Sequence, residues 1–168
     1  MKYKIVLAGD GAVGKTSLIN RFVTGAFAGD YKATIGVAIT AKSLIVNDKE
    51  VNLQIWDVAG QTLFRQFRKK FYTKAEGALL VFDLTVPKSL DNLHLSWMSD
   101  IKEITGDIPT VLVGNKVDLR ELQAISPEEI SSFLDQHPMC SHINTSALTG
   151  EGVEKAFHDL VTCIVNQE

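Results

Sequence analysis

The chain has 168 residues, of which 45% are hydrophobic and 22% charged, an ordinary composition for one globular domain. Its net charge of −3 gives no positive field that could hold a nucleic-acid backbone, so we expect no nucleic-acid partner. No apolar run reaches the roughly 18 residues that a membrane span needs, and the last four residues contain no cysteine for prenylation. The sequence as written therefore predicts a soluble, cytoplasmic monomer, which would reach the cytoplasmic face of a membrane only through a lipidated tail outside this sequence.

The chain contains two cysteines, Cys140 and Cys163. They form no CxxC motif and have no companion histidines at the intervals of a metal site. We expect two reduced thiols in an intracellular protein.

Alternating strand and helix patterns run along the chain. Short, mostly apolar runs predict strands at residues 3–8, 38–46, 51–57, 78–82, 110–113 and 143–145. Helical spacing predicts helices at residues 16–22, 64–71, 89–104, 127–136 and 153–165. Asn47-Asp48 supplies a hairpin turn between the second and third strands, and the later strands follow one another through helices. We therefore expect one α/β domain over residues 1–168, a mostly parallel six-stranded sheet with one antiparallel edge strand and helices on both faces.

Two of these helices carry additional signals. Phe64, Phe67 and Phe71 have the three-then-four spacing of one apolar stripe, with arginines and lysines around it. Ser126 precedes Pro127 and two glutamates, which is a strong signal for a helix start.

A glycine-rich segment follows the first predicted strand and precedes the first predicted helix. Its sequence, Gly9-Asp10-Gly11-Ala12-Val13-Gly14-Lys15-Thr16, is a full match to GxxxxGK[ST]. Glycines let backbone N–H groups turn toward phosphate oxygens, and the helix N-terminus adds its dipole. We expect Lys15 to reach the β- and γ-phosphates of a nucleotide and Thr16 to offer its hydroxyl to Mg²⁺. The alternative is a glycine turn with a surface lysine.

A second segment, Asn115-Lys116-Val117-Asp118, follows the fifth predicted strand. The carboxylate of Asp118 can accept hydrogen bonds from guanine N1–H and from the exocyclic amine. Adenine has an acceptor at N1 and no amine at C2, so Asp118 selects guanine. The short motif alone would fit a solvated loop, but its position relative to the phosphate loop favours a GTP/GDP site.

A third segment, Asp57-Val58-Ala59-Gly60, ends the third predicted strand. Asp57 can hold Mg²⁺ through water, because this ion keeps part of its hydration shell. Gly60 has no side chain to block its N–H from a γ-phosphate, and Gln61 is placed to orient an attacking water. Gln61, Lys15 and Gly60 are the expected catalytic residues, and Mg²⁺ is the expected cofactor.

On these motifs the chain resembles a P-loop NTPase of the small G-domain type, a Ras-superfamily small GTPase, and within that superfamily most closely a Rab. The segments 34–37, 53–57, 80–85 and 149–151 carry the rest of the resemblance, which covers essentially the whole chain. It implies that Thr34 binds Mg²⁺ only while a γ-phosphate is present.

The same resemblance implies the other contacts of the nucleotide. Phe27 packs against the guanine edge, Tyr31 closes over the phosphates, and the Ala147 N–H meets guanine O6. The expected nucleotide contacts are Gly11, Ala12, Val13, Gly14, Lys15, Thr16, Ser17, Phe27, Tyr31, Thr34, Gly60, Asn115, Lys116, Asp118, Ser146, Ala147 and Leu148. The expected metal ligands are Thr16, Thr34 and Asp57.

The sequence also departs from the Rab pattern. Thr62-Leu63 follows Gln61 where Rabs usually have Glu-Arg, which bears on partner recognition. Leu148 replaces a lysine and is expected to loosen nucleotide binding slightly, and Gly11 stands where many Rabs have serine. The cysteine-bearing Rab tail is not in this sequence, which leaves lipidation open.

Two surface features have alternative interpretations. An apolar triad matches the one through which Rabs contact effectors, but it fits a simple core equally well; it consists of Ile39, Trp56 and Phe71. A basic group on the second predicted helix is either a partner surface or a solvated face. Its members are Arg65, Arg68, Lys69 and Lys70.

The resulting hypothesis is a Rab-like GTP-binding switch in membrane traffic that slowly hydrolyses GTP to GDP and phosphate. Effectors, an exchange factor and an activating protein are the expected partners. Residues 30–40 contain no arginine, so no internal arginine finger is evident and turnover on the order of 10⁻⁴ s⁻¹ is expected, as for unassisted Ras. The alternatives are a P-loop ATPase or kinase, against which Asp118 argues, and a pseudo-GTPase scaffold, against which the intact catalytic and metal-binding residues argue.

Overall fold

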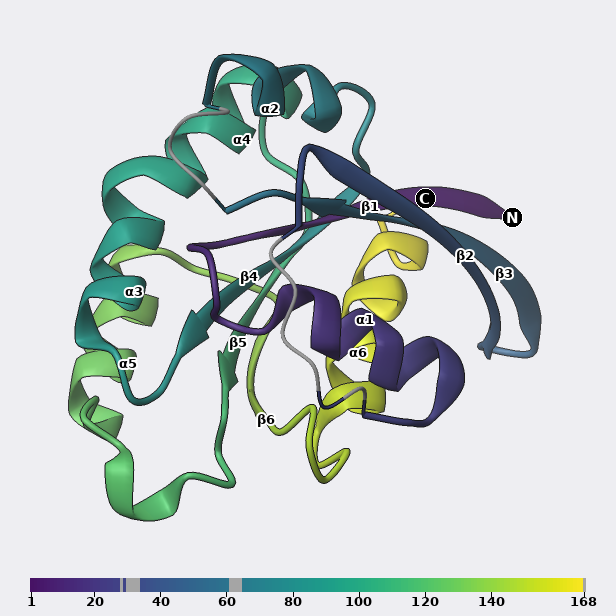
Figure 1. Ribbon diagram of the computed structural model, residues 1–168. Helices are drawn as coiled ribbons and strands as arrows, with labels where there is room; N and C mark the ends of the chain where they lie inside the picture. The colour runs from purple at the N-terminus through teal and green to yellow at the C-terminus, as the bar shows by residue number, and fades with distance from the viewer. Residues whose placement is uncertain (28, 30–33, 61–64, 168) are drawn as a thin grey trace.

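Six strands form one sheet in the order β2-β3-β1-β4-β5-β6 (Figure 1). Their bounds are Lys2–Ala8 (β1), Val37–Val46 (β2), Lys49–Val58 (β3), Gly77–Asp83 (β4), Thr110–Asn115 (β5) and Ser141–Thr145 (β6). The structure is a computed structural model that describes residues 1–27, 29, 34–60 and 65–167. Neighbouring strands are parallel except β2 and β3, which makes β2 an antiparallel edge strand. The predicted sheet is confirmed.

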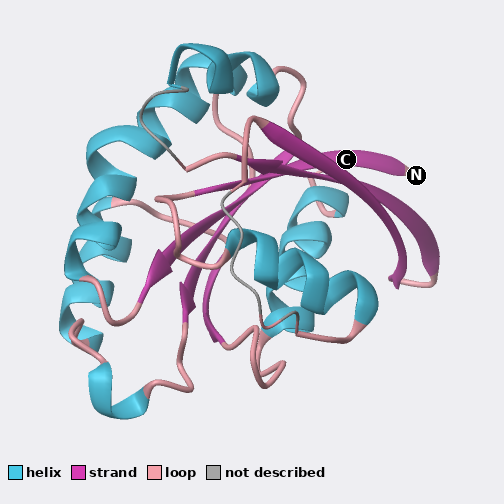
Figure 2. Ribbon diagram, viewed as in Figure 1, coloured by secondary structure: helices cyan, strands magenta, loops and turns pink. Residues whose placement is uncertain are grey.

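The helices lie on both faces of this sheet (Figure 2). They are α1 (Lys15–Thr24), α2 (Arg65–Tyr72), α3 (Pro87–Asn92), η2 (Leu93–Trp97), α4 (Met98–Thr105), the short η3 (Arg120–Leu122), α5 (Pro127–Gln136) and α6 (Val153–Val165). α1 and α6 cover one face, whereas α2, α5 and the continuous α3–η2–α4 segment cover the other. None of the described helices combines the length and the apolar character needed to cross a membrane.

The central strand β1 is buried on both faces. Ile5 and Leu7 pack into the core beneath α1 and α6, whereas Val6 and Ala8 pack into the core on the opposite face. This alternation follows from the two-residue period of a strand and explains the continuous apolar run in the sequence. Because β1 lies between β3 and β4, the loop that follows it leaves the sheet near the middle of the edge where the parallel strands end.

Two local sequence signals are confirmed. Asn47 and Asp48 both have positive φ, 50° and 60°, as the tight turn of the β2–β3 hairpin requires. At the start of α5, the Glu129 N–H donates to the Ser126 hydroxyl at 3.1 Å, and the Ser126 N–H donates to the Glu129 carboxylate at 2.7 Å. This reciprocal pair is a capping box, which satisfies two N–H groups that a helix start leaves open.

Two other local features differ from expectation. The helix predicted at 89–104 begins at Pro87 and contains the π-helical turn η2, in which the Met98 N–H donates to the Leu93 carbonyl. A pattern of apolar residues cannot indicate such a wide turn, because tertiary contacts decide it. The apolar stripe predicted on α2 is wrong in part, because Phe71 packs against the core while Phe67 is 55% exposed. Phe64 lies outside the described residues.

The expectation of two reduced thiols is wrong. Cys140 and Cys163 form a disulfide, and their Cα atoms are 6.5 Å apart. Cys140 immediately precedes β6, and Cys163 lies near the C-terminal end of α6. The two residues meet because α6 runs back along β6, so that its C-terminal end reaches the start of that strand. A separation of 23 residues gives no spacing signal for this pairing.

Candidate nucleotide-binding site

The phosphate loop, residues 9–14, connects β1 to α1. Gly14 has a φ of 101°, and a Cβ there would lie 2.2 Å from Nδ2 of Asn115, so the position requires glycine. The N-terminal N–H groups of α1 open toward this loop, and Gly14 has no side chain to cap them. The Lys15 ammonium, on a residue only 6% exposed, donates to two carbonyl oxygens of the loop at 2.8 Å each. Backbone N–H groups at a helix N-terminus beside a cation are the pattern that binds phosphate.

Asn115, at the end of β5, joins the phosphate loop to β6. Its amide donates to the Val13 carbonyl at 2.9 Å and its amide oxygen accepts from the Thr145 hydroxyl at 3.0 Å. Asn115 is 2% exposed, so both hydrogen bonds are shielded from water. The side chain therefore fixes the position of the phosphate loop relative to two strand ends.

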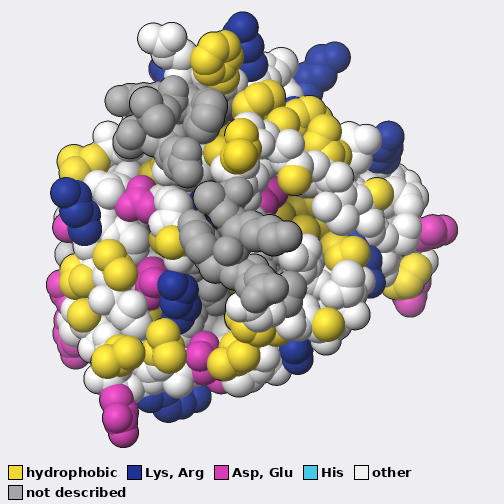
Figure 3. Space-filling model, viewed as in Figure 1, with side chains coloured by type: hydrophobic (Ala, Val, Ile, Leu, Met, Phe, Trp, Pro, Cys, Tyr) yellow, Lys and Arg dark blue, Asp and Glu magenta, His cyan; other side chains and the backbone are white. Residues whose placement is uncertain are grey.

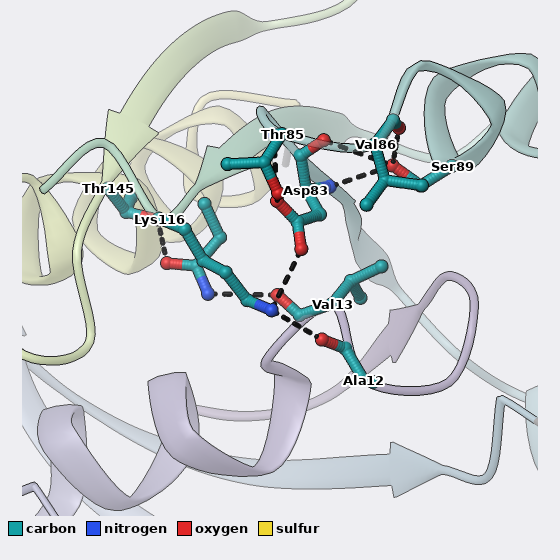
Figure 4. Close-up of polar contacts among 9 residues, drawn as sticks. Ala12, Val13, Asp83, Thr85, Val86, Ser89, Lys116 and Thr145 are labelled. Atoms are coloured by element: carbon teal, nitrogen blue, oxygen red, sulfur yellow. Dashed lines mark hydrogen bonds and ion pairs between the residues drawn. The ribbon is translucent and has the colours of Figure 1, made fainter. Parts of the chain in front are cut away.

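Lys116 makes a similar bridge to the end of β4 (Figure 4). Its ammonium donates to the Ala12 carbonyl at 2.9 Å and lies 2.8 Å from Oδ2 of Asp83. The other oxygen of Asp83 accepts from the Thr85 N–H and hydroxyl at 2.8 and 2.7 Å. Asp83 is 4% exposed, and this complete set of partners offsets the cost of burying its charge.

A cavity of about 290 Å³ opens between the phosphate loop and the loops that follow β5 and β6. Ligand pockets typically measure about 300 to 1,000 Å³, so this cavity can hold part of a ligand such as a base. In its wall, Oδ1 of Asp118 accepts from the Ser146 hydroxyl at 2.7 Å. The lining residues are Ala12, Gly14, Ser17, Phe27, Gly29, Asn115, Lys116, Asp118, Leu119, Ala147 and Leu148. All except Gly29 and Leu119 are among the predicted nucleotide contacts.

Three predicted metal ligands meet beside the phosphate loop. Oγ1 of Thr16 lies 2.6 Å from Oγ1 of Thr34 and donates to Oδ2 of Asp57 at 2.5 Å. Thr34 donates to the same carboxylate oxygen at 3.3 Å. Asp57 is 3% exposed, and within the described part of the chain its Oδ1 is buried without a hydrogen-bond partner. Hydroxyl and carboxylate oxygens are the ligands that Mg²⁺ prefers, so these residues fit that ion.

Gly60 packs directly against the phosphate loop. A Cβ at this position would lie 2.3 Å from the Gly11 nitrogen and 2.5 Å from the Asp10 carbonyl carbon, so only glycine fits. One residue earlier, the Ala59 N–H donates to the Gly36 carbonyl at 2.9 Å. The end of β3 is therefore joined to the segment before β2, and these two segments carry the predicted contacts to a γ-phosphate.

Some predicted residues are not placed, and some residues of the site were not predicted. Tyr31 and Gln61 lie outside the described residues, as does Thr62-Leu63, and their roles stay predictions. Sequence reasoning missed Asp83, although it ends a parallel strand just as the predicted carboxylate metal ligand does. It also missed the pair formed by Asn92 and Trp97, which reach the phosphate loop from a helix on the face of the sheet. No local pattern marks that pair.

The apolar triad forms part of the surface beside β2 and α2. Ile39 and Trp56 are register partners across β2 and β3, and the Trp56 and Phe71 ring centroids are 6.4 Å apart. Ile39 is 54% exposed, whereas Trp56 and Phe71 are half-buried against the core. Figure 3 shows hydrophobic side chains gathered over α2, β2 and β3. Ile39 therefore belongs to the surface, and the two aromatic rings connect it to the core.

The basic group on α2 is only partly solvated. Lys69 lies 2.6 Å from Glu103 and 3.9 Å from Asp100, both in α4, whereas Lys70 is exposed. The side chains of Arg65 and Arg68 lie outside the described part of the chain. Lys69 thus forms ion pairs with α4, and the Lys70 ammonium lies 5.9 Å from the centroid of the Phe67 ring.

Comparison with protein families matches residues 4–166 to the Ras family. The chain belongs to the Ras family. It is 40% identical to the Ras-related protein RABA1c of Arabidopsis thaliana over 163 residues, which cover 96% of this chain and 74% of the relative. It is 42% identical to RABA1h of the same plant over 164 residues, with the same two coverages. It is 39% identical to the GTP-binding protein ypt3 of Schizosaccharomyces pombe over 161 residues, covering 95% of this chain and 74% of the relative.

These matches confirm the family and the GTPase class that the motifs predicted. In this Ras-family GTPase, the predicted site residues that the structure describes lie at one edge of the sheet. They come from the loop after β1 and the first turn of α1, from the ends of β3 and β5 and the loops that follow them, from the loop after β6, and from the segment before β2. Ligands of open α/β sheets bind at such an edge, beyond the carboxyl ends of the strands.

Proposed function

We propose that this Ras-family GTPase is a Rab-like switch that binds GTP and hydrolyses it slowly to GDP and phosphate. The observation that carries the proposal is the meeting of Thr16, Thr34 and Asp57, whose oxygen atoms lie 2.5 to 3.3 Å apart. Thr34 lies 18 residues from Thr16 and 23 residues from Asp57. A ligand that binds all three therefore joins α1, β3 and the segment before β2.

Guanine is the base that the cavity favours. The Asp118 carboxylate lies in the cavity wall, where it would accept hydrogen bonds from guanine N1–H and from the exocyclic amine. Adenine would place its N1 acceptor against this carboxylate and leave both groups without a donor, which costs affinity. Phe27 is 40% exposed at the same cavity and would pack against the purine ring.

Hydrolysis transfers the γ-phosphoryl group of GTP to water. The water oxygen bonds to the γ-phosphorus as the bond to the β–γ bridging oxygen breaks, GDP leaves with that oxygen, and the water proton passes to the phosphate product. Lys15 and the N–H of Gly60 stabilise the negative charge on the phosphate oxygens, and Gln61 orients the water. Thr16, Thr34 and Asp57 would hold Mg²⁺, which would supply further neutralisation of the phosphate charge.

The proposed cycle is slow and has two states. Without an arginine near Thr34, turnover is expected on the order of 10⁻⁴ s⁻¹, which an activating protein would raise. Thr34 and Gly60 have a γ-phosphate to contact only in the GTP state. Hydrogen exchange in residues 34–60 and 65–72 should therefore be slower with a nonhydrolysable GTP analogue than with GDP.

The partners that we propose follow from this cycle. The surface around Ile39, Trp56 and Phe71 adjoins the segments that respond to the γ-phosphate, so it is the proposed effector surface. An exchange factor and an activating protein complete the cycle, and the chain acts as a single monomeric G domain. We propose a role in membrane traffic at cytoplasmic membrane faces, with attachment through a lipidated tail, and the similarity to Rab-named relatives supports this proposal.

One purified sample tests the proposal. The protein is denatured, its bound nucleotide is identified by chromatography, and a second portion is loaded with GTP and Mg²⁺ to follow phosphate release. We expect bound GDP and slow release that is lost in Gln61→Leu. Gln167→Leu, a matched change at an exposed position near the C-terminus, should behave as the wild type.

Each of the other outcomes would indicate a different function for this protein. Displacement of labelled GDP by ATP at equal concentration would indicate an ATPase or kinase. Tight GDP binding with no turnover, in the wild type and in Gln61→Leu alike, would indicate a nucleotide-binding scaffold. An absence of guanine-nucleotide binding would overturn the proposal.

A further inference from the structure

The carboxylate of Asp10, in the phosphate loop, is held from outside the loop. Nδ2 of Asn92 donates to one oxygen at 2.7 Å, and Nε1 of Trp97 donates to the other at 2.9 Å. These donors lie 82 and 87 residues further along the chain. Trp97 is 2% exposed within the core beneath α3–η2–α4, so its ring is fixed in place. We call these three residues the Asp10 clamp.

The π-helical turn η2 makes the clamp possible. In a regular α-helix of 3.6 residues per turn, positions 92 and 97 would point about 140° apart around the axis. The wider turn, closed by the hydrogen bond from the Met98 N–H to the Leu93 carbonyl, brings the two positions toward the same side. Such turns interrupt α-helices rarely and are frequent at functional sites.

The main chain of Asp10 touches two parts of the proposed hydrolytic machinery. Its carbonyl oxygen accepts from the Lys15 ammonium at 2.8 Å. A Cβ on Gly60 would lie 2.5 Å from its carbonyl carbon and 2.8 Å from its carbonyl oxygen, so Gly60 packs directly on this peptide unit. The side chain of Asp10 is therefore fixed by the helix while its main chain sets the places of Lys15 and Gly60.

We propose that Asn92 and Trp97 are positioning residues for GTP hydrolysis, acting through Asp10. They hold the outer turn of the phosphate loop at the place where Lys15 and Gly60 must meet the γ-phosphate. This inference rests on the proposed function and names two further residues for the same site. It assigns the clamp to the γ-phosphate end, because the base cavity is lined by Ala12 and Gly14 but not by Asp10.

An exchange of donor and acceptor tests the clamp. In Asn92→Asp two carboxylates face each other, and in Asp10→Asn the charge that attracts both donors is lost. The double variant Asp10→Asn with Asn92→Asp restores both hydrogen bonds, because the new amide accepts from Trp97 and donates to the new carboxylate. Asp91→Asn and Asn166→Asp are matched control variants at exposed positions.

The measurements are the single-turnover rate of GTP hydrolysis, the GDP dissociation constant and the melting temperature. We expect Asn92→Asp to lower the hydrolysis rate by roughly tenfold, the value of one hydrogen bond to a charged group, with at most about a twofold change in GDP affinity. The double variant should recover the rate to within about twofold of the wild type. Both control variants should match the wild type.

Two results would overturn the clamp. One is a wild-type hydrolysis rate in Asn92→Asp, and the other is a double variant that stays as slow as Asn92→Asp although its melting temperature is normal. If Asn92→Asp does not fold, Trp97→Phe, which removes the N–H donor and keeps an aromatic ring, takes its place and must slow hydrolysis more than it weakens GDP binding. A wild type that does not hydrolyse GTP would instead refute the proposed function, so the two failures are distinct.

Discussion

The two sides of the proposed nucleotide site are built differently. The proposed base side consists of Asn115, Lys116, Asp118 and Ser146. The proposed γ-phosphate side consists of Thr16, Thr34, Asp57 and Gly60. Side chains of the base side form hydrogen bonds to the phosphate loop, to β4 and to β6. The γ-phosphate side is joined through two hydroxyls that share one carboxylate oxygen and through the packing of a glycine.

This difference indicates that one side recognises guanine and the other responds to the γ-phosphate. The side chains of Asn115 and Lys116 are held by hydrogen bonds and an ion pair within the protein, so they need no ligand to keep their geometry. On the γ-phosphate side, one oxygen of Asp57 is buried without a partner among the described residues, and the hydroxyls of Thr16 and Thr34 share the other. We therefore expect guanine recognition to be the same in both nucleotide states and the γ-phosphate side to depend on what is bound.

The largest effect should come from breaking the base side. In Asp118→Asn, the carboxylate that accepts two hydrogen bonds from guanine is replaced by an amide, so guanine loses two hydrogen bonds to a charged group. At about 1.5 to 3 kcal/mol each, GDP affinity should fall by at least about a hundredfold. Competition with labelled GDP measures this loss, and Asp135→Asn, at an exposed position on α5, is the control. Unchanged GDP affinity would show that Asp118 does not contact the base.

The second effect concerns the disulfide, which closes the part of the chain that contains the base loop after β6. The double variant Cys140→Ser with Cys163→Ser should have a free energy of unfolding lower by about 3 kcal/mol, because an unfolded chain without the cross-link has more conformational entropy. Urea unfolding measures the change, and the wild type in excess dithiothreitol should match the variant. GDP affinity should not change, since the base side is held by its own hydrogen bonds. A parallel loss of GDP affinity would make the disulfide a part of that side.

A smaller effect should come from the γ-phosphate side. Thr34→Ala removes one proposed metal ligand, so affinity for GTP with Mg²⁺ should fall about tenfold, the value of one polar contact to a charge, while GDP affinity stays the same. The difference should disappear when EDTA removes the metal ion. Thr40→Ala, in β2, is the control. An equal loss for both nucleotides would contradict the division into two sides.

The smallest effect should arise away from both sides, between η2 and α5. There His94 Nδ1 lies 2.7 Å from His137 Nε2, and burial together with the charge of His94 lowers the pKa of His137. Burial also lowers the pKa of His142. A lowered pKa means that the unfolded chain binds more protons, so stability should be full above about pH 6.5 and decline as the pH falls below it. Melting temperatures between pH 7.5 and pH 5.5 measure this decline.

The variant His137→Gln tests whether His137 causes the decline in melting temperature at low pH. His137→Gln removes one titrating group and the repulsion with His94 on protonation, so its melting temperature should depend less on pH than that of the wild type. A decline of the same size in both proteins would assign the effect to other groups, with His142 the first to test.

Much of the fold could be predicted from the sequence, because its signals are local. The apolar period of β1, the Asn47-Asp48 turn and the capping box at Ser126 each need only a few neighbouring residues. At the candidate site, the predicted residues that the structure describes lie together at one edge of the sheet, whereas Tyr31 and Gln61 lie outside the described residues and stay predictions. The thiols of Cys140 and Cys163 were predicted wrongly, since nothing in a separation of 23 residues indicates contact.

The sequence by itself determined which chemical groups this protein brings to the proposed nucleotide site. A lysine and a threonine after a glycine loop, a carboxylate at a strand end and the Asp118 segment follow from residue type and position along alternating strands and helices. Only the tertiary structure decided the Asp10 clamp, the Lys116 bridge to Asp83 and the disulfide. These contacts join residues between 23 and 87 positions apart. Such contacts depend on how the helices pack on the sheet, so no periodic pattern in the sequence indicates them.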